Sequence, residues 1–150
     1  MLVDISHISP GGFWDTLKVS QKCIVASHSN AKSVCNVPRN LTNKQIKAIA
    51  KTNGIIGINF CPSFLNKSGK ADINDVIKHI NYIKRLVGID YIGLGTDFDG
   101  IKKTPTGLDD ITFLIKLEEQ LYKNEYTSEE VNKIMQKNWL RVFKEVLGGS

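Results

Sequence analysis

The chain has 150 residues, of which 41% are hydrophobic and 23% are charged, the proportions of a single soluble globular domain with its own core. Its longest apolar runs, such as residues 54–60, are far too short to cross a bilayer, so we predict no transmembrane segment. The net charge of +5 comes from lysines that are scattered without interleaved aromatic residues, a pattern that favours a solvated surface over nucleic-acid binding.

The apolar pattern predicts strands and helices in alternation along the chain. Short apolar runs predict strands at 2–6, 23–26, 55–60 and 91–95. Helical spacing follows the first three of these runs, at 11–17, 42–50 and 72–87, and further helices are predicted at 109–123, from 127 and at 139–147. Thr42 and Asp72 are the expected first caps, Gly88 ends the third helix, and residues 127–130 form a capping-box sequence.

Four strand–helix units in a row indicate a parallel sheet with helices packed outside. The predicted strands are nearly continuous apolar runs, as expected for strands that are buried on both faces. A doubly wound sheet and a barrel both fit this pattern, but no glycine-rich nucleotide motif follows any strand. A (β/α)8 TIM barrel needs about 250 residues, so four units correspond to half of one. We therefore predict an α/β fold of four parallel βα units with extra C-terminal helices.

Polar residues stand at the carboxyl ends of all four predicted strands: His7, His28, Asn59 and Asp97. In a barrel these residues would converge on the rim that carries the active site. Two histidines alone are no metal motif, but their shared placement favours ligation of zinc, which neutral imidazole binds well. His79 lies in the middle of a helical segment and is predicted to be a surface or helix-packing residue.

The sequence around Asp97 distinguishes it from its neighbour Asp99. Gly93 and Gly95 lie on the same face of the predicted strand as Asp97. Because glycines occupy the two preceding positions on that face, the Asp97 carboxylate is expected to point inward. Asp99 is followed by Gly100, which is typical of a turn. Asp97 is therefore the predicted catalytic residue and Asp99 the predicted turn residue.

Six segments together resemble the renal (membrane) dipeptidase family of metallopeptidases. They occur in the order and spacing of the family and extend over essentially the whole chain. The segments are Asp-Ile-Ser-His at 4–7, Ser-His-Ser-Asn at 27–30, Pro-Arg-Asn at 38–40, Asn-Phe at 59–60, Gly-Thr-Asp-Phe-Asp-Gly at 95–100, and Asn-Trp-Leu-Arg-Val-Phe at 138–143.

The resemblance implies an amidohydrolase-type barrel with two zinc ions bridged by a glutamate, of which residues 1–150 would form the second half. His7 and His28 match the histidines on the fifth and sixth strands that ligate the second zinc. Asp97 matches the aspartate that ends the eighth strand and handles the proton of the attacking water. Arg39 matches the arginine that binds the terminal carboxylate of a dipeptide, and a planar guanidinium suits that role.

The resemblance also assigns two residues to the substrate site. Asn59 lies in the matching segment after the third strand. Phe64 stands where some family members carry a substrate-contacting tyrosine, so the hydrogen bond of that tyrosine is expected to be absent here.

The departures from the family concern the first zinc. Its His-x-Asp pair and the bridging glutamate belong to the N-terminal half, and no His-x-Asp occurs in this sequence. The sequence thus predicts a zinc-dependent dipeptidase present as a C-terminal half that is inactive alone. The alternative is an inactive or split fragment that acts as an assembly partner for a missing N-terminal half. Since an open half-barrel leaves a sheet edge bare, self-association as a dimer is also expected.

Three cysteines, an odd number without CxxC spacing, argue against a disulfide framework. They are predicted to be buried free thiols. This cysteine usage favours a reducing compartment, so the predicted location is cytoplasmic.

Overall fold

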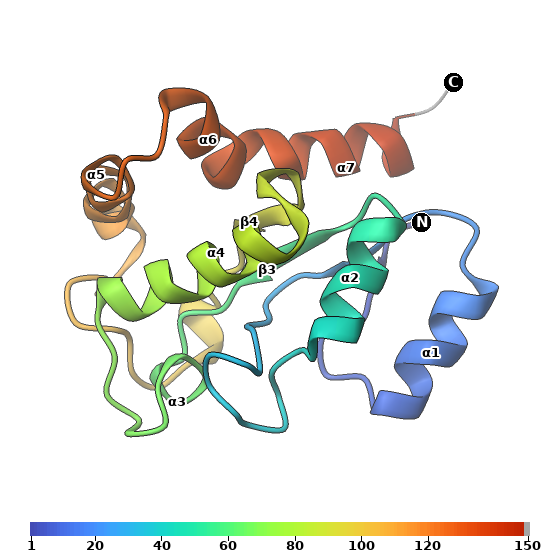
Figure 1. Ribbon diagram of the computed structural model, residues 1–150, viewed down its shortest axis with the longest axis horizontal. Coiled ribbons are helices and arrows are strands. Elements are labelled where there is room, and N and C mark those ends of the chain that lie inside the picture. The colour runs from blue at the N-terminus through green and yellow to red at the C-terminus, as the bar shows by residue number, and fades with distance from the viewer. Residues whose placement is uncertain (149–150) are drawn as a thin grey trace.

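A computed structural model describes residues 1–148 of the chain (Figure 1). Its strands form one parallel sheet in which neighbours along the chain are neighbours in space. The strands, in sheet order, are β1 (Val3–Asp4), β2 (Ile24–Ala26), β3 (Ile55–Ile58) and β4 (Ile92–Leu94). This topology confirms the predicted α/β fold of four parallel βα units.

Three of the helices begin with a capping box. The side chains of Thr42, Asp72 and Thr127 each accept the backbone N–H three residues on, and the side chain of that residue accepts the backbone N–H of the cap. The capping box at Thr127 was predicted, whereas Thr42 and Asp72 were predicted only as helix starts. The helices are α1 (Pro10–Val19), α2 (Asn43–Lys51), α3 (Pro62–Leu65), α4 (Ile73–Val87), α5 (Leu114–Lys123), α6 (Ser128–Asn132) and α7 (Asn138–Leu147). Short helical turns are η1 (Ile89–Tyr91), η2 (Phe98–Gly100) and η3 (Ile111–Phe113), and the π-helical η4 (Lys133–Lys137) joins α6 to α7. Among residues 1–148, no helix has both the length and the apolar character of a bilayer span.

The strands are shorter than the apolar runs that predicted them, and side-chain hydrogen bonds join the chain where β1, β2 and β3 end. Beyond β3, the backbone N–H of Asn59 donates to Asn30 Oδ1 at 3.1 Å, and Asn30 Nδ2 donates to the Asn59 carbonyl at 3.0 Å. The N–H of Ser27, just beyond β2, donates at 2.9 Å to Oδ1 of Asp4, the last residue of β1. These bonds fix the spacing between the carboxyl ends of adjacent strands. They therefore also fix the spacing of the polar residues that follow those ends.

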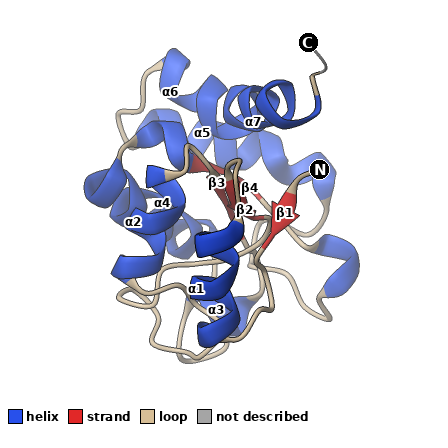
Figure 2. Ribbon diagram, turned by 90° about the vertical axis from the view of Figure 1, so that its right-hand side faces the viewer, coloured by secondary structure: helices blue, strands red, loops and turns tan. Residues whose placement is uncertain are grey.

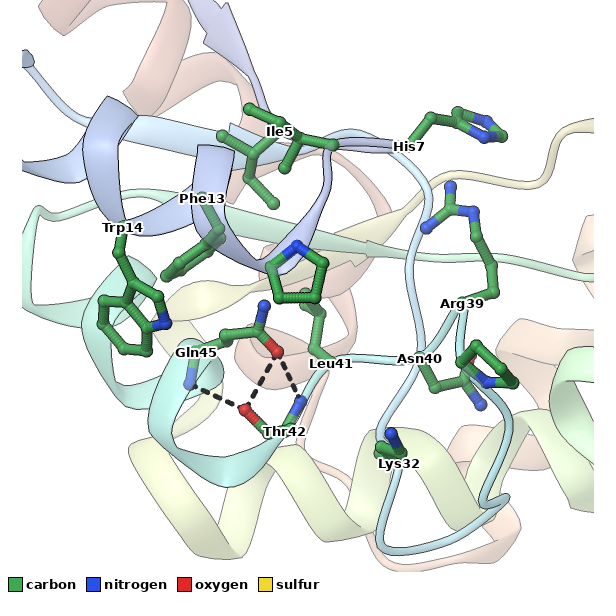
Figure 3. A pocket seen from close by; sticks show the side chains of 13 residues that line it. Ile5, His7, Phe13, Trp14, Lys32, Arg39, Asn40, Leu41, Thr42 and Gln45 are labelled. Carbon is green, nitrogen blue, oxygen red and sulfur yellow. Dashed lines mark hydrogen bonds between the residues drawn. The ribbon is translucent and has the colours of Figure 1, made fainter.

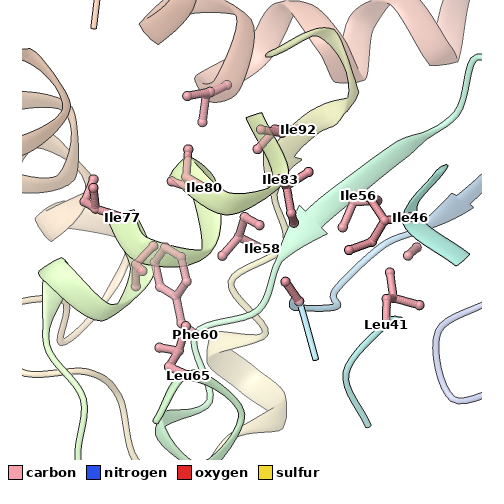
Figure 4. Packing of buried hydrophobic residues seen from close by; sticks show 14 of the residues in the cluster. Leu41, Ile46, Ile56, Ile58, Phe60, Leu65, Ile77, Ile80, Ile83 and Ile92 are labelled. Atoms are coloured by element: carbon pink, nitrogen blue, oxygen red, sulfur yellow. The ribbon is translucent and has the colours of Figure 1, made fainter. Parts of the chain in front are cut away.

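The outer face of the sheet is covered by helices, and α4 packs over β3 and β4 (Figure 4). Ile77, Ile80 and Ile83 lie on one side of α4 and are almost fully buried. They face a layer that includes Ile58 of β3 and Ile92 of β4, which are also buried. The helical spacing of the isoleucines therefore has the predicted role, and the sheet behind the rim has a close-packed support.

On the inner face of the sheet, α7 crosses near the amino ends of the strands, and Trp139 Nε1 of this helix donates to the carbonyl of Leu94 in β4 at 3.0 Å. Asn138 Nδ2 donates to the carbonyls of Ile89 and Ile92, both at 2.8 Å, and Arg141 Nη1 donates to the Asn53 carbonyl at 2.7 Å. The carbonyls that these two residues contact lie at or just before the starts of β3 and β4. In Figure 1, α7 accordingly lies at the opposite side of the molecule from α3.

The rest of the inner face is an open groove of about 610 Å³. Its sheet side includes Leu2, Asp4, Val25 and Ser27, and its helix side includes aromatic and aliphatic residues of α7. Leu140 and Phe143 in that helix are 48% and 41% exposed. The strand order leaves β1 and β4 at the two edges of the sheet, and Figure 2 shows β1 at its edge.

Of the two alternatives predicted for His79, a surface residue or a helix-packing residue, the surface alternative is wrong. The side chain is 0% exposed and both ring nitrogens are bonded to backbone groups. The N–H of Ala31 donates to Nδ1 at 3.1 Å, so Nε2 carries the proton and donates to the Leu65 carbonyl, also at 3.1 Å. A central position in a helical pattern cannot reveal that two loops fold over the residue. His79 thus ties α4 to the loops that follow β2 and β3.

Because of this histidine, the folded protein is expected to become less stable as the pH falls below 6.5. Burial lowers the pKa of His79 from 6.5 to about 4. The unfolded chain therefore takes up a proton that the folded chain excludes, and the stabilising contribution is complete above pH 6.5 and declines as the pH falls toward 4. The full difference corresponds to about 3 kcal/mol. Urea unfolding at pH 7.5 and at pH 5 measures the part of this difference that is lost by pH 5, about 2 kcal/mol. A His79→Gln variant should lose this part of the pH dependence, and an equal slope in both proteins would contradict the assignment.

Candidate metal and substrate site

The four polar residues at the strand ends lie at the same edge of the sheet, as predicted, and they form two contacting pairs. His7 follows β1 and His28 follows β2, and their Nε2 atoms are 2.8 Å apart. Asn59 follows β3 and donates through Nδ2 to Asp97 Oδ2, beyond β4, at 3.0 Å. The structure therefore brings together side chains that are up to 90 positions apart in the sequence.

The histidine pair has the chemistry of a partial metal site. Burial lowers the pKa of His28, the carboxylates of Asp97 and Asp4 oppose this effect, and the positive charge of Arg39 adds to it. At neutral pH His28 is thus the neutral imidazole that binds zinc. Two nitrogens directed at one another fit a shared ion as part of its ligand set. Among residues 1–148, no group of three or more His, Cys, Asp or Glu side chains could hold an ion without further donors.

A serine and an aspartate lie behind His28. Ser27 Oγ is 2.7 Å from His28 Nδ1 and donates to Asp4 Oδ2 at 2.5 Å. Burial raises the pKa of Asp4, but the hydrogen bonds donated by Ser27 and Ser6 outweigh it and hold the pKa below its usual value. Sequence reasoning assigned no role to this pair. The available signal was the carboxylate of Asp4 inside an apolar run, next to a strand end that carries a histidine.

A hydrogen bond from Asn59 orients the side chain of Asp97. Its side chain is almost fully buried, and its Oδ1 accepts the N–H of Cys61 at 2.6 Å, which leaves the amide nitrogen directed at Asp97. The backbone of Asn59 is paired with Asn30, as described above. The observed contact of this side chain is therefore with the candidate catalytic carboxylate, and its predicted contact with substrate remains a prediction.

His7 and Asp97 share an unusual backbone conformation. Their φ angles are 68° and 62°, in the left-handed region that non-glycine residues rarely occupy. The other non-glycine residues with positive φ in residues 1–148 are Asn53 and Glu125, which follow helices α2 and α5. Such a conformation costs roughly 1–2 kcal/mol and persists where the surroundings impose it, often at functional sites. Asp99 lies in the adjoining turn η2 and is exposed, as predicted.

Arg39 is fixed at the same rim by the residues that follow β2. Nη1 donates to Ser29 Oγ at 3.0 Å and Nη2 donates to the His28 carbonyl at 2.9 Å. Its guanidinium also lies 5.9 Å from the ring centre of Phe64. A guanidinium has five N–H donors, so these bonds orient the group and leave donors for a further ligand. The structure thus places Arg39 and Phe64 side by side, and Arg39 contacts His28 directly.

Two cavities meet at His7. One, of about 460 Å³, has His7 and Arg39 at one end and Trp14 of α1 at the other (Figure 3). The second, of about 430 Å³, is lined by residues that include His7, Phe64 and Asp97. The candidate metal-binding nitrogen, the carboxylate and the guanidinium therefore all border space that a small molecule could enter.

Comparison with known proteins gives a consistent result. The family model of the membrane dipeptidases, peptidase family M19, matches residues 1–148. An uncharacterised protein of Klebsiella pneumoniae, encoded in the pqqA 5′ region, is 39% identical over 150 residues, which are 97% of this chain and 55% of that protein. The crystal structure of dipeptidase AC, a metallopeptidase of family M19, has a TM-score of 0.92 at 33% identity, over 97% of this chain and 44% of that one.

A second solved structure bears on the ligand. It is a metallopeptidase from Rhodobacter sphaeroides liganded with a phosphinate mimic of the dipeptide L-Ala-D-Ala. Its TM-score is 0.90 at 33% identity, over 95% of this chain and 41% of that one. The chain therefore spans about half the length of the relatives that it matches. Four adjacent parallel strands in about half the length of these relatives are consistent with a half-barrel.

Proposed function

Because the chain belongs to the membrane dipeptidase family, peptidase family M19, we propose that residues 1–150 form the C-terminal half of a zinc-dependent dipeptidase barrel. In this proposal His7 and His28 ligate zinc, Asp97 transfers the proton, and Arg39 binds the terminal carboxylate of a dipeptide. The observation that carries it is the approach of the two histidine Nε2 atoms to 2.8 Å at the rim that also holds Asp97.

The reaction divides between the metal centre and the residues of this chain. Bound zinc would polarise the peptide carbonyl and make water more acidic. Asp97 accepts the proton of the attacking water and returns it to the leaving amine. The bond from Asn59 keeps the Asp97 carboxylate in one orientation during both transfers. This reading gives Asn59 a positioning role beside the substrate contact that its sequence position implies.

Arg39 explains why a dipeptide would be preferred. A carboxylate anchor so close to the metal-binding histidines leaves room for one residue beyond the scissile bond. The bonds from Arg39 to Ser29 and to the His28 carbonyl orient the guanidinium before substrate arrives. Phe64, packed on the guanidinium, supplies an apolar contact to the substrate in place of a tyrosine hydroxyl.

Substitution of Arg39 tests the substrate half of the proposal. We expect Arg39→Ala to raise KM by about 10- to 100-fold with little change in kcat, since a carboxylate anchor acts equally in the ground state and the transition state. Steady-state kinetics of the assembled barrel on a dipeptide measure both constants. Arg85→Ala, on an exposed part of α4, is the matched control and should leave both unchanged. A fall in kcat at constant KM would contradict the anchor role.

The remaining metal ligands are proposed to come from an N-terminal half that docks on the inner face. A catalytic zinc usually has three protein ligands, and the histidine pair supplies two. The open groove and the sheet edges at β1 and β4 offer a surface on which further parallel strands could pair. A second copy of this chain fits less well, because each copy brings its own α7 to the amino ends of the strands.

The decisive experiment uses a family member as the source of the missing half. The 150-residue chain with zinc should hydrolyse dipeptides negligibly by itself. Addition of the segment of an M19 dipeptidase that this chain does not cover should produce a complex with zinc-dependent activity. A stable complex without activity would favour the alternative function, that of an inactive assembly partner. Robust hydrolysis by the isolated chain would overturn the half-site proposal.

The state of the cysteines supports a cytoplasmic location as part of this proposal. Cys23, Cys35 and Cys61 are free thiols, and burial raises the pKa of Cys23 and Cys35. Cys61 is only partly buried, so the prediction that all three thiols are buried is wrong for this residue. Unpaired thiols of this kind are usual in a reducing compartment. Fractionation of the native host cells would test the location directly.

A further inference from the structure

The metal-facing nitrogen of His28 lies at one end of a chain of hydrogen bonds that crosses from β2 to β1. His28 Nδ1 is 2.7 Å from Ser27 Oγ, and Ser27 Oγ is 2.5 Å from Asp4 Oδ2. The other oxygen of Asp4 accepts the backbone N–H groups of Ser6 and Ser27 at 3.0 and 2.9 Å. The carboxylate is therefore held from two sides and has one oxygen directed at the serine hydroxyl.

The direction of each bond follows from Asp4. A carboxylate only accepts hydrogen bonds, so the single hydroxyl proton of Ser27 lies on the bond to Asp4. Ser27 Oγ can then only accept from His28, which places a proton on Nδ1 and leaves a lone pair on Nε2. Since His28 Nε2 accepts, His7 Nε2 is the donor of the 2.8 Å bond between the rings when no metal is bound.

We infer that Asp4 and Ser27 are positioning residues that fix His28 in the Nδ1–H tautomer, with the Nε2 lone pair presented to the metal. The inference rests on the proposed function for the identity of the ligand, but the tautomer itself is a property of the chain alone. A histidine that binds metal through one nitrogen commonly donates its other N–H to an oxygen acceptor, which fixes both the tautomer and the ring orientation.

Asp4→Asn would reverse the chain of hydrogen bonds. The amide oxygen can still accept the two backbone N–H groups, while the amide nitrogen faces Ser27 and donates to it. The Ser27 hydroxyl then donates to His28 Nδ1, so the ring proton moves to Nε2, where it blocks metal binding. Almost nothing changes in shape, so the variant separates the tautomer from the packing.

The experiment is nitrogen-15 NMR of the imidazole rings in the metal-free 150-residue chain at a pH above 7.5, followed by titration with zinc alone. We expect Nδ1–H at His28 in the unmodified chain and in Ser27→Thr, which keeps the hydroxyl. Asp4→Asn should show Nε2–H, and Ser27→Ala should show a mixture of tautomers. Zinc affinity should fall by about 10- to 100-fold in Asp4→Asn and in Ser27→Ala. Asp15→Asn, an exposed aspartate on α1, is the matched control and should change neither result.

The outcomes distinguish a failure of the inference about the His28 tautomer from a failure of the proposed function. Nε2–H at His28 in the unmodified chain, or an unchanged tautomer in Asp4→Asn, overturns the inference. If Asp4→Asn loses the amide spectrum of a folded protein, the comparison of Ser27→Ala with Ser27→Thr decides in its place. Tautomers that respond as expected, together with a zinc affinity of the assembled barrel that is the same with and without His28, would support the tautomer inference and refute the metal role of His28.

Discussion

Replacement of Asp97 by asparagine is expected to lower kcat for dipeptide hydrolysis by about two to four orders of magnitude in the assembled barrel. Asparagine keeps the shape of the side chain and can still accept the bond from Asn59, but it cannot take up the proton of the attacking water. Asparagine also tolerates the left-handed backbone at this position, so the variant should fold normally. The fall should therefore come from the chemistry and not from a loss of structure.

The matched control for this substitution is Asp99→Asn. Asp99 lies two residues further on, is exposed and belongs to the turn η2. Steady-state kinetics on the two variants, with thermal unfolding as a check of folding, complete the comparison. Equal activities in the two variants would mean that Asp97 is not the proton carrier.

Removal of either histidine of the pair is expected to abolish tight zinc binding by the assembled barrel. The loss should exceed the roughly 10- to 100-fold effect that changes in the surrounding residues produce, because a direct ligand is removed. For His28 the replacement is alanine. For His7, whose φ is 68°, the replacement is asparagine, which tolerates that backbone conformation. Titration with zinc by calorimetry measures the affinity.

A double variant that carries both replacements, His7→Asn and His28→Ala, provides a further control. It retains His79, whose two ring nitrogens are both bonded to backbone groups and are not free to bind metal. The double variant should therefore bind no zinc at the rim although one histidine remains. Undiminished binding in either single variant would show that the 2.8 Å approach of the rings has no role in metal binding.

The fold was largely predictable because its elements have simple periodic patterns. The isoleucines of α4 recur at helical spacing, and Thr42 and Thr127 carry recognisable capping boxes. The helix α3 was missed because its four residues are too few to show any period. The ends of β1 and β3 were predicted too late, since bonds such as that from Asn59 to Asn30 depend on contacts that the local sequence does not encode.

The candidate site was predictable only in part, and for a similar reason. His7, His28 and Asp97 could be identified because each ends an apolar run, and the ends of parallel strands meet at one edge. The link from Asp4 to Ser27 depends on the register of β1 against β2, in which Asp4 pairs with Val25, and a single strand pattern carries no such register. The burial of His79 under two loops was likewise invisible in the helical pattern.

The placement of α7 has a consequence for the order in which the protein can be completed during synthesis. Arg141 binds the carbonyl of Asn53, 88 positions earlier in the chain, and Val142 and Val146 cover Val25 and Ile55. A nascent chain that has released all four strands from the ribosome, but not yet α7, still exposes these apolar residues. Such a chain depends on a helix that leaves the exit tunnel after all four strands, and until then a chaperone would be needed to protect the exposed residues.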